Sequence, residues 1–217
     1  MQITHLGHAA VLVETQQVRI LIDPGNLSDS WHGVRDLDAV LVTHVHPDHL
    51  DPQHVPPLLA ANPSAQVFAE ASIPDALAAN DVELGSLHPV SAGNDVQIGD
   101  VLVSAVGGVH AEIHRDIPRI GNVGYVLRAE GEPSLFHPGD SYAAFAAGVD
   151  IVAIPAYGPW AALKETIDFV RSVGALEGFC IHDQLLNARG LGLISGRIRD
   201  MTRTRVVDLS SGASHRF

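Results

Sequence analysis

One short sequence pattern occurs twice in this chain. Leu21–Gly25 is a hydrophobic pair followed by an Asp-Pro-Gly turn, and Leu135–Gly139 repeats it with His in place of Asp. A hydrophobic segment with Asp at its second position follows each copy, as Leu37–Val42 and Val149–Ile154. Repeated units of this kind indicate repeated architecture. We therefore predict an α/β protein with an internal pseudo-duplication, in which two sheet-plus-helix halves pack sheet to sheet as a four-layer αββα sandwich.

Short runs rich in β-branched residues and bounded by turn residues predict strands, whereas longer segments with helical spacing of apolar residues predict helices. On these signals, strands are expected at 2–6, 10–14, 18–22, 39–43, 66–69, 96–98, 101–106, 124–129, 134–136, 149–154, 178–181 and 205–209. Helices are expected at 55–61, 72–80 and 162–173, and the final residues 210–217 are expected to form a polar tail.

A dense group of metal-ligand side chains follows the fourth predicted strand. His44, His46, Asp48 and His49 lie within six residues. Residues two apart in an extended backbone share a face, so His44 and His46 should project together. Pro47 suits the first turn of a helix, which would carry Asp48 and His49 to the other side of the same cavity. This segment therefore predicts a site for two adjacent metal ions.

Three later residues are further candidate ligands. His110 follows two glycines that allow a strand to end sharply, and its rival His114 lies four residues later in a predicted loop. Asp140 follows a Pro-Gly pair, where Asp commonly caps a turn, a role compatible with metal binding. His182 ends a hydrophobic run, where a lone His is ordinarily a satisfied core residue.

The segment 43–50 resembles the signature of the metallo-β-lactamase fold superfamily. The Gly7-His8-Ala9 opening and the Asp23-Pro24 turn resemble its branch of small metal-dependent hydrolases. That branch includes the ascorbate-6-phosphate lactonases and the phospholipase D-like N-acylethanolamine phosphodiesterases. The resemblance covers nearly the whole chain. It implies the four-layer fold and a binuclear site, but lactonases, thioesterases, phosphodiesterases and nucleases share these motifs.

The resemblance also implies a role for each residue of the site. Asp23 would support a ligand by accepting an imidazole N–H. Independently of the resemblance, His8 has two interpretations, a pocket acid and a structural cap under the metals, and the cap is favoured. Asp48 and His182 are the expected catalytic residues. The implied ligands are His44, His46 and His110 for one metal, Asp48, His49 and His182 for the other, and Asp140 as the bridge between them.

Aromatic residues on predicted loops suggest where a substrate would bind. Tyr157 and Trp160 lie on a Gly-Pro loop after a predicted strand, a common position for a pocket wall. We expect Trp31, in the loop before the metal-binding segment, to form the opposite wall. His114 is expected on the substrate side of the site.

The length and composition favour one domain spanning residues 1–217, because 217 residues with 46% hydrophobic content can bury one substantial core. No apolar stretch is long enough to cross a bilayer, and the first residues lack the features of a secretory signal. Cys180 is the only cysteine, so an intrachain disulfide cannot form. We therefore expect a cytoplasmic protein; a homo-oligomer remains open.

The charge excludes one class of partner. The net charge of -12 and the 13 scattered Lys and Arg residues argue against nucleic acid, whose phosphate backbone is bound by clustered basic side chains. A small-molecule substrate is expected instead.

Together these features predict a binuclear metal-dependent hydrolase that cleaves a small ester, lactone or phosphoester through a metal-bound hydroxide. The His-rich ligand set suits zinc, while its carboxylates also admit manganese or iron. One alternative is an iron-dependent oxidoreductase on the same ligand frame; a version with its own flavin would need a further domain. Another is a non-catalytic metal-binding module, which would be expected to have lost ligands.

Overall fold

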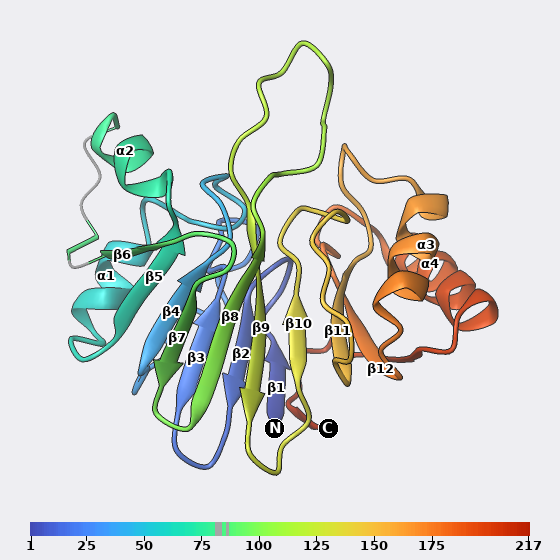
Figure 1. Ribbon diagram of the computed structural model, residues 1–217, viewed down its shortest axis with the longest axis horizontal. Coiled ribbons are helices and arrows are strands. Elements are labelled where there is room, and N and C mark those ends of the chain that lie inside the picture. The colour runs from blue at the N-terminus through green and yellow to red at the C-terminus, as the bar shows by residue number, and fades with distance from the viewer. Residues whose placement is uncertain (81–83, 86) are drawn as a thin grey trace.

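The structure is a computed structural model that describes residues 1–80, 84–85 and 87–217. Two seven-stranded sheets pack against each other. Helices α1 (Val55–Ala60) and α2 (Ile73–Ala78) lie outside one sheet, and α3 (Leu163–Val173) and α4 (Ala188–Met201) lie outside the other (Figure 1). The predicted four-layer αββα sandwich is confirmed.

The first sheet has the strand order β14-β1-β2-β3-β4-β5-β6. Strands β1 to β3 pair antiparallel, and β3 to β6 pair parallel. Its strands are β1 (Gln2–His5), β2 (Val11–Glu14), β3 (Arg19–Ile22), β4 (Ala39–Val42), β5 (Gln66–Glu70), β6 (Leu87–Val90) and β14 (His215–Arg216).

The second sheet, ordered β13-β12-β11-β10-β9-β8-β7, repeats this topology. Strands β8 to β10 pair antiparallel and β10 to β13 pair parallel, as β1 to β3 and β3 to β6 do. The repeated hydrophobic-turn pattern lies at the ends of the equivalent strands β3 and β10. The strands are β7 (Asp95–Ile98), β8 (Val101–Gly107), β9 (Val123–Ala129), β10 (Leu135–His137), β11 (Ile151–Pro155), β12 (Glu177–Ile181) and β13 (Arg205–Val207).

Strand β4 is hydrophobic throughout because both of its faces are buried. Ala39 and Leu41 pack into the core between the sheets, whereas Val40 and Val42 pack toward α1 and α2. A strand covered on both faces needs apolar side chains at every position, because alternate residues point to opposite faces. The parallel strands therefore form a rigid base for the polar residues that follow them.

Three elements differ from the sequence expectations. Helix α4 was not predicted because Gly190, Gly192 and Gly196 weaken its helical signal, although the Asn187 side chain caps it by accepting the N–H of Gly190. Strand β6 was also missed; it contains Pro and lies at a sheet edge. The predicted polar tail was wrong in part, because His215–Arg216 pairs with β1.

Among the described residues, no helix is both long and apolar enough to span a bilayer. The segments that follow β4, β8, β10 and β12 meet at one edge of the two sheets, and the long loop between β8 and β9 rises above that edge (Figure 1).

Candidate metal centre

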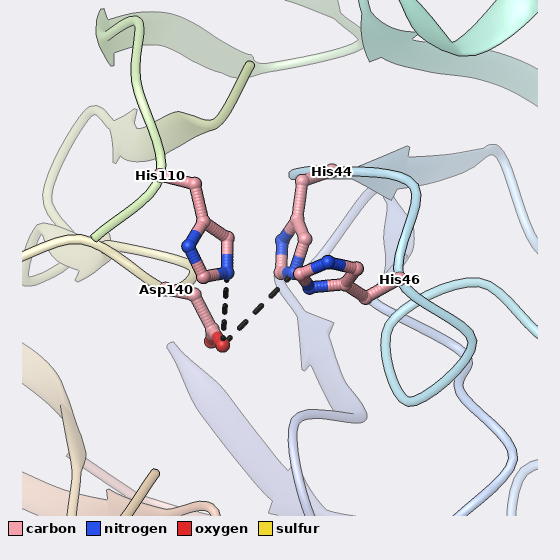
Figure 2. A group of neighbouring side chains, drawn as sticks. All are labelled: His44, His46, His110 and Asp140. Carbon is pink, nitrogen blue, oxygen red and sulfur yellow. Dashed lines mark hydrogen bonds and ion pairs between the residues drawn. The ribbon is translucent and has the colours of Figure 1, made fainter. Parts of the chain in front are cut away.

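One group of candidate ligands comes from three separate loops. His44 and His46 follow β4, His110 follows β8 and Asp140 follows β10, and all four offer ligand atoms within 4.8 Å of one another (Figure 2). His44 Nε2 lies 3.1 Å from His46 Nδ1, and His110 Nε2 lies 3.4 Å from Asp140 Oδ2. Three imidazole nitrogens and one carboxylate oxygen form a donor set that suits a divalent transition metal.

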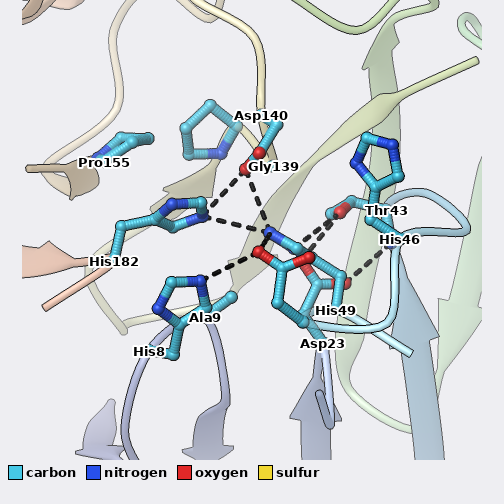
Figure 3. Close-up of polar contacts among 12 residues, drawn as sticks. His8, Ala9, Asp23, Thr43, His46, His49, Gly139, Asp140, Pro155 and His182 are labelled. Carbon is cyan, nitrogen blue, oxygen red and sulfur yellow. Dashed lines mark hydrogen bonds and ion pairs between the residues drawn. The ribbon is translucent and has the colours of Figure 1, made fainter. Parts of the chain in front are cut away.

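A second group lies on the other side of Asp140. His49 Nε2 and His182 Nε2 are 3.1 Å apart, and they lie 3.0 and 2.8 Å from Asp140 Oδ1 (Figure 3). Asp140 therefore directs Oδ2 toward the first group and Oδ1 toward the second. This is the arrangement that a carboxylate bridging two cations requires.

The hydrogen bonding in this centre is incomplete in a way that fits metal ions. His110 Nε2 and Asp140 Oδ1 are buried atoms without a hydrogen-bond partner. Buried polar atoms are normally paired, because leaving one unpaired costs about 1–3 kcal/mol. A cation in the first group would satisfy His110 Nε2, and a cation in the second group would satisfy Asp140 Oδ1. The residues present therefore fit the two metals that the sequence predicts.

His8 lies closer to the second group than the sequence indicated. The structure groups His8, rather than Asp48, with His49 and His182. The Asp48 side chain is 29% exposed, with Oδ2 at 3.1 Å from His8 Nε2 and 3.9 Å from His49 Nε2. Asp48 therefore faces the open side of the centre, and its role as a ligand stays a prediction.

Backbone strain is concentrated at this centre. His8, Asp23 and His182 have positive φ angles of 52°, 48° and 61°, which non-glycine residues rarely adopt. The strained segments hold one another: the His182 N–H donates to the His8 carbonyl at 2.8 Å, and the His8 N–H donates to Asp183 Oδ1 at 2.9 Å. Strain of this kind typically gathers at functional sites.

The Asp23 carboxylate contacts His49 and fixes the orientation of its ring. The carboxylate accepts the Thr43 N–H at 2.8 Å and the Thr43 hydroxyl at 2.7 Å, and it lies 2.7 Å from His49 Nδ1. With a proton on Nδ1 donated to Asp23, the His49 Nε2 lone pair points toward Asp140. Such carboxylate–imidazole pairs commonly orient metal-binding histidines.

Burial and charge shift the pKa values of these groups in opposite directions. Burial lowers the pKa of His44 well below its ordinary value, and neighbouring His49 adds to this, so His44 is neutral with a lone pair available. Burial alone would also lower the pKa of His49, but the carboxylates of Asp140 and Asp23 outweigh it and raise that pKa well above normal. The same negative charge that attracts a proton to His49 would attract a cation in its place.

Other side chains hold the ligand-bearing loops, and sequence reasoning did not identify their roles. Asn122 is fully buried; its Oδ1 accepts the Asp140 N–H at 2.9 Å, and its Nδ2 donates to the Pro138 carbonyl at 3.0 Å. Arg119 donates two N–H groups to the His110 carbonyl, at 3.0 and 2.7 Å. A single Asn before a strand and a single Arg in a loop carry no local signal of such contacts.

Of the residues predicted to line a substrate pocket, Trp160 contacts the candidate metal centre, whereas Tyr157 and His114 are exposed. Trp160 is 9% exposed, and its indole N–H donates to Asp140 Oδ2 at 2.8 Å, so it touches the centre directly. Tyr157, on the same loop, is 40% exposed, and its contact with substrate stays a prediction. His114 is exposed and lies 3.6 Å from Asp116. Its place on the substrate side also stays a prediction.

The expectation for Trp31 was wrong. Trp31 has no exposed surface; it packs with Val40, Val42 and Leu50 on the helix side of the first sheet, and its indole N–H donates to the Gly25 carbonyl at 3.0 Å. An aromatic residue in a loop before a motif is as consistent with core packing as with a pocket. Burying the large apolar ring in the core stabilises the fold, and this accounts for the position of Trp31.

His32, Asp51 and His54 form a third group, beside the loop after β3. The rings of His32 and His54 stack with centroids 4.2 Å apart and planes inclined by only 18°, whereas His44 and His46 are inclined by 83°. Imidazole lone pairs lie in the ring plane, so stacked rings do not direct them at one point. Asp51 instead accepts the backbone N–H of Gln53 at 2.8 Å and lies 2.6 Å from His54 Nδ1. This group stabilises the start of α1.

We expect Asp23→Asn to weaken metal binding by roughly 10–100-fold, the usual effect of removing an outer carboxylate behind a histidine ligand. The amide keeps the size of the side chain, but its NH₂ group cannot accept from Thr43 or His49. Metal affinity is measured by competition with a chromogenic chelator. Asp150→Asn is the matched control, because the Asp150 carboxylate also accepts an N–H and a hydroxyl from one residue, Ser134. Asp150 directly precedes β11, at the end of the sheet opposite the candidate metal centre. Equal metal affinities for the two variants would contradict the role of Asp23.

Comparison with known proteins agrees with the fold and identifies the family. Residues 2–176 match the family model described as a β-lactamase superfamily domain. Protein Rv0786c of Mycobacterium tuberculosis is 37% identical over 206 residues, covering 94% of each chain. A UPF0173 metal-dependent hydrolase of Saccharolobus solfataricus is 30% identical over 147 residues, covering 64% of this chain and 61% of that protein.

Among solved structures, the metallo-β-lactamase fold protein YhfI of Bacillus subtilis aligns with a TM-score of 0.76 and 12% sequence identity, over 100% of this chain and 99% of that one. At this identity the likeness shows the fold alone. With the family match over most of its length and relatives named as metal-dependent hydrolases, this chain belongs to the β-lactamase superfamily and has the metallo-β-lactamase fold.

Proposed function

We propose that this protein, acting as one hydrolase domain, uses two divalent metal ions to cleave a small ester, lactone or phosphoester. The observation that carries the proposal is the position of Asp140, with one carboxylate oxygen facing each of two imidazole groups. His44, His46 and His110 would hold one ion. His49 and His182, completed by Asp48 or His8, would hold the other. A pair of ions in this setting would lower the pKa of water and polarise the bond to be cleaved.

Asp48 is positioned to orient the attacking water. It lies on the open side of the centre, and its Oδ2 is 3.1 Å from His8 Nε2. Burial alone would raise the pKa of Asp48, but the hydrogen bond from His8 and the charge of His49 outweigh it and lower that pKa below its ordinary value. The carboxylate is therefore ionised at neutral pH and can accept a hydrogen bond from water.

Trp160 and Asn122 both hold Asp140 in position. The indole N–H binds one carboxylate oxygen and the Asn122 amide binds the backbone N–H, so the side chain and the main chain of Asp140 are both fixed. A bridging carboxylate held in this way would keep the two groups of histidines at a constant separation. Such preorganisation reduces the reorganisation needed during reaction.

We expect the zinc-loaded protein to contain about two metal ions per chain, since the candidate ligands form two groups that share one carboxylate. The protein is stripped with a chelator, reconstituted with zinc and analysed by elemental mass spectrometry. Hydrolysis of a panel of esters, lactones and phosphodiesters is measured before and after reconstitution, and should depend on the metal. His44→Ala is expected to reduce the content to about one ion, while His88→Ala, on the edge strand β6, leaves it unchanged. One ion in the unaltered protein would contradict the binuclear proposal.

A further inference from the structure

Strand β10 ends in a buried imidazole that the proposed function does not use. His137 has no exposed surface, and it stands where the first copy of the repeated pattern has Asp23. Alternate residues of a strand point to opposite faces, so His137 shares the face of Leu135, which packs in the core between the two sheets. Buried polar side chains are normally hydrogen-bonded. The partners of His137 therefore indicate its role.

Both ring nitrogens of His137 contact main-chain groups beside residues of the candidate metal centre. Nε2 lies 3.2 Å from the carbonyl oxygen of Ala9, which directly follows His8. Nδ1 accepts the N–H of Gly139, which directly precedes Asp140, at 3.3 Å. Ala9 lies between β1 and β2 of the first sheet, whereas Gly139 follows β10 of the second. One side chain thus connects the two halves of the protein at the centre.

These contacts fix the tautomer of His137. The Ala9 carbonyl can only accept a hydrogen bond and the Gly139 N–H can only donate one, so the ring hydrogen is on Nε2 and the lone pair is on Nδ1. Burial lowers the pKa of His137 to about 4, although the Asp23 carboxylate acts in the opposite direction. The ring is therefore neutral at neutral pH, as this pair of hydrogen bonds requires.

An aspartate at this position, as in the first copy of the pattern, could not replace the imidazole. A carboxylate has no hydrogen to donate to the Ala9 carbonyl. It would also bring a second buried negative charge close to Asp23, whose Oδ2 lies 3.9 Å from His137 Nδ1. The equivalent ends of β3 and β10 therefore need different side chains: Asp23 accepts hydrogen bonds only, whereas His137 donates one and accepts one.

The two main-chain groups adjoin contacts that set the geometry of the centre. The His8 carbonyl, one residue before Ala9, accepts the His182 N–H at 2.8 Å. Displacing the Ala9 peptide would therefore disturb the contact that places His182. Gly139 has a φ of 61°, and a Cβ on it would lie within 2.8 Å of three neighbouring side-chain atoms. Its turn is tightly packed, and loss of the hydrogen bond to Nδ1 would leave its N–H unpaired there.

We propose that His137 is a positioning residue of the metal centre: its two hydrogen bonds set the position of Asp140 relative to His182 and thereby the separation of the two metal ions. The inference rests on the proposed two-metal function and adds a residue that is not itself a candidate ligand. Outer residues that hold the ligands of a metal commonly affect its affinity.

The test uses three variants that separate the two hydrogen bonds. His137→Leu removes both, His137→Gln keeps a donor for the Ala9 carbonyl, and His137→Asn keeps an oxygen that can accept the Gly139 N–H. We expect the affinity for the more weakly bound zinc ion, measured by competition with a chromogenic chelator, to fall roughly 10–100-fold in His137→Leu and less in the other two. The visible absorption spectrum of the Co(II)-substituted protein reports ligand geometry and should change in the same order.

Phe136→Leu is the matched control for lost stability. Phe136 precedes His137 on β10 and also has no exposed surface, but it packs on the opposite face of the sheet, with its ring centroid 6.1 Å from that of Phe169 in α3. Urea denaturation of the metal-free proteins measures how far each variant is destabilised. We expect Phe136→Leu to lose stability while it keeps the zinc affinity and the Co(II) spectrum of the unaltered protein.

The outcomes separate this inference from the function on which it rests. Unchanged zinc affinity and Co(II) spectrum in His137→Leu, equal losses in all three His137 variants, or an equal loss in Phe136→Leu would overturn the inference and leave the hydrolase in place. If His137→Leu does not fold, unchanged affinity in both His137→Gln and His137→Asn would overturn it. If the unaltered protein does not bind two ions or cleaves no ester, lactone or phosphodiester, the proposed function fails, and the role of His137 fails with it.

Discussion

Replacing Asp48 with Asn is expected to reduce hydrolytic turnover by roughly 10²–10⁴-fold while the protein remains folded. The amide has almost the same shape but carries no negative charge, so it is a poor hydrogen-bond acceptor for the attacking water and a poor metal ligand. The Asp48 side chain is 29% exposed, and its hydrogen-bond partner is His8, so the core is not disturbed. The measurement is kcat on the best ester of the panel, with circular dichroism to verify the fold.

The effect of Asp48→Asn on metal content distinguishes a role of Asp48 as a metal ligand from a role in orienting water. A loss of the second ion would identify Asp48 as a ligand, whereas two bound ions with low turnover would identify it as the group that orients water. Asp36→Asn is the control, because the Asp36 side chain is 91% exposed and lies in a surface turn. Turnover equal to that of the unaltered enzyme would exclude both roles for Asp48.

Gly25→Ala is expected to destabilise the protein by about 4 kcal/mol or more. Single substitutions cause losses of this size only when they create a severe steric or packing defect. A Cβ at Gly25 would lie 1.8 Å from the carbonyl oxygen of Asp48 and 2.0 Å from its carbonyl carbon. Both atoms belong to the backbone, so no side chain can move aside. The turn after β3 would have to separate from the segment that carries Asp48 and His49.

The free energy of unfolding is measured by urea denaturation of the metal-free proteins, so that metal binding does not mask the change. Gly33→Ala is the matched control, since a Cβ there would meet nothing within 4 Å. We expect that variant to differ from the unaltered protein by less than about 0.5 kcal/mol. Stability of Gly25→Ala within that same limit would show that the two loops can separate without cost.

The repeated hydrophobic-turn pattern was sufficient to predict the architecture because it reflects burial on both faces of central strands. Parallel strands such as β4 must be apolar throughout, and the sequence shows this directly. Elements whose stability depends on distant partners gave no such signal. Strand β14 has polar residues and forms because β1 offers an unpaired edge, and α4 contains three glycines and forms by packing Ile198 against the second sheet.

The sequence by itself determined that His44, His46 and His49 lie together, because three imidazoles spaced so closely after a buried strand cannot be far apart. Through the resemblance, it also predicted that His110, Asp140 and His182 join them, although these residues are distant in the chain. Three features became visible only in the tertiary structure: the Trp160 indole N–H bound to Asp140 Oδ2, the position of His8 beside Asp48, and the burial of Trp31. Each of these contacts joins segments that are brought together by the pairing of strands within one sheet, and no local pattern of residues encodes them.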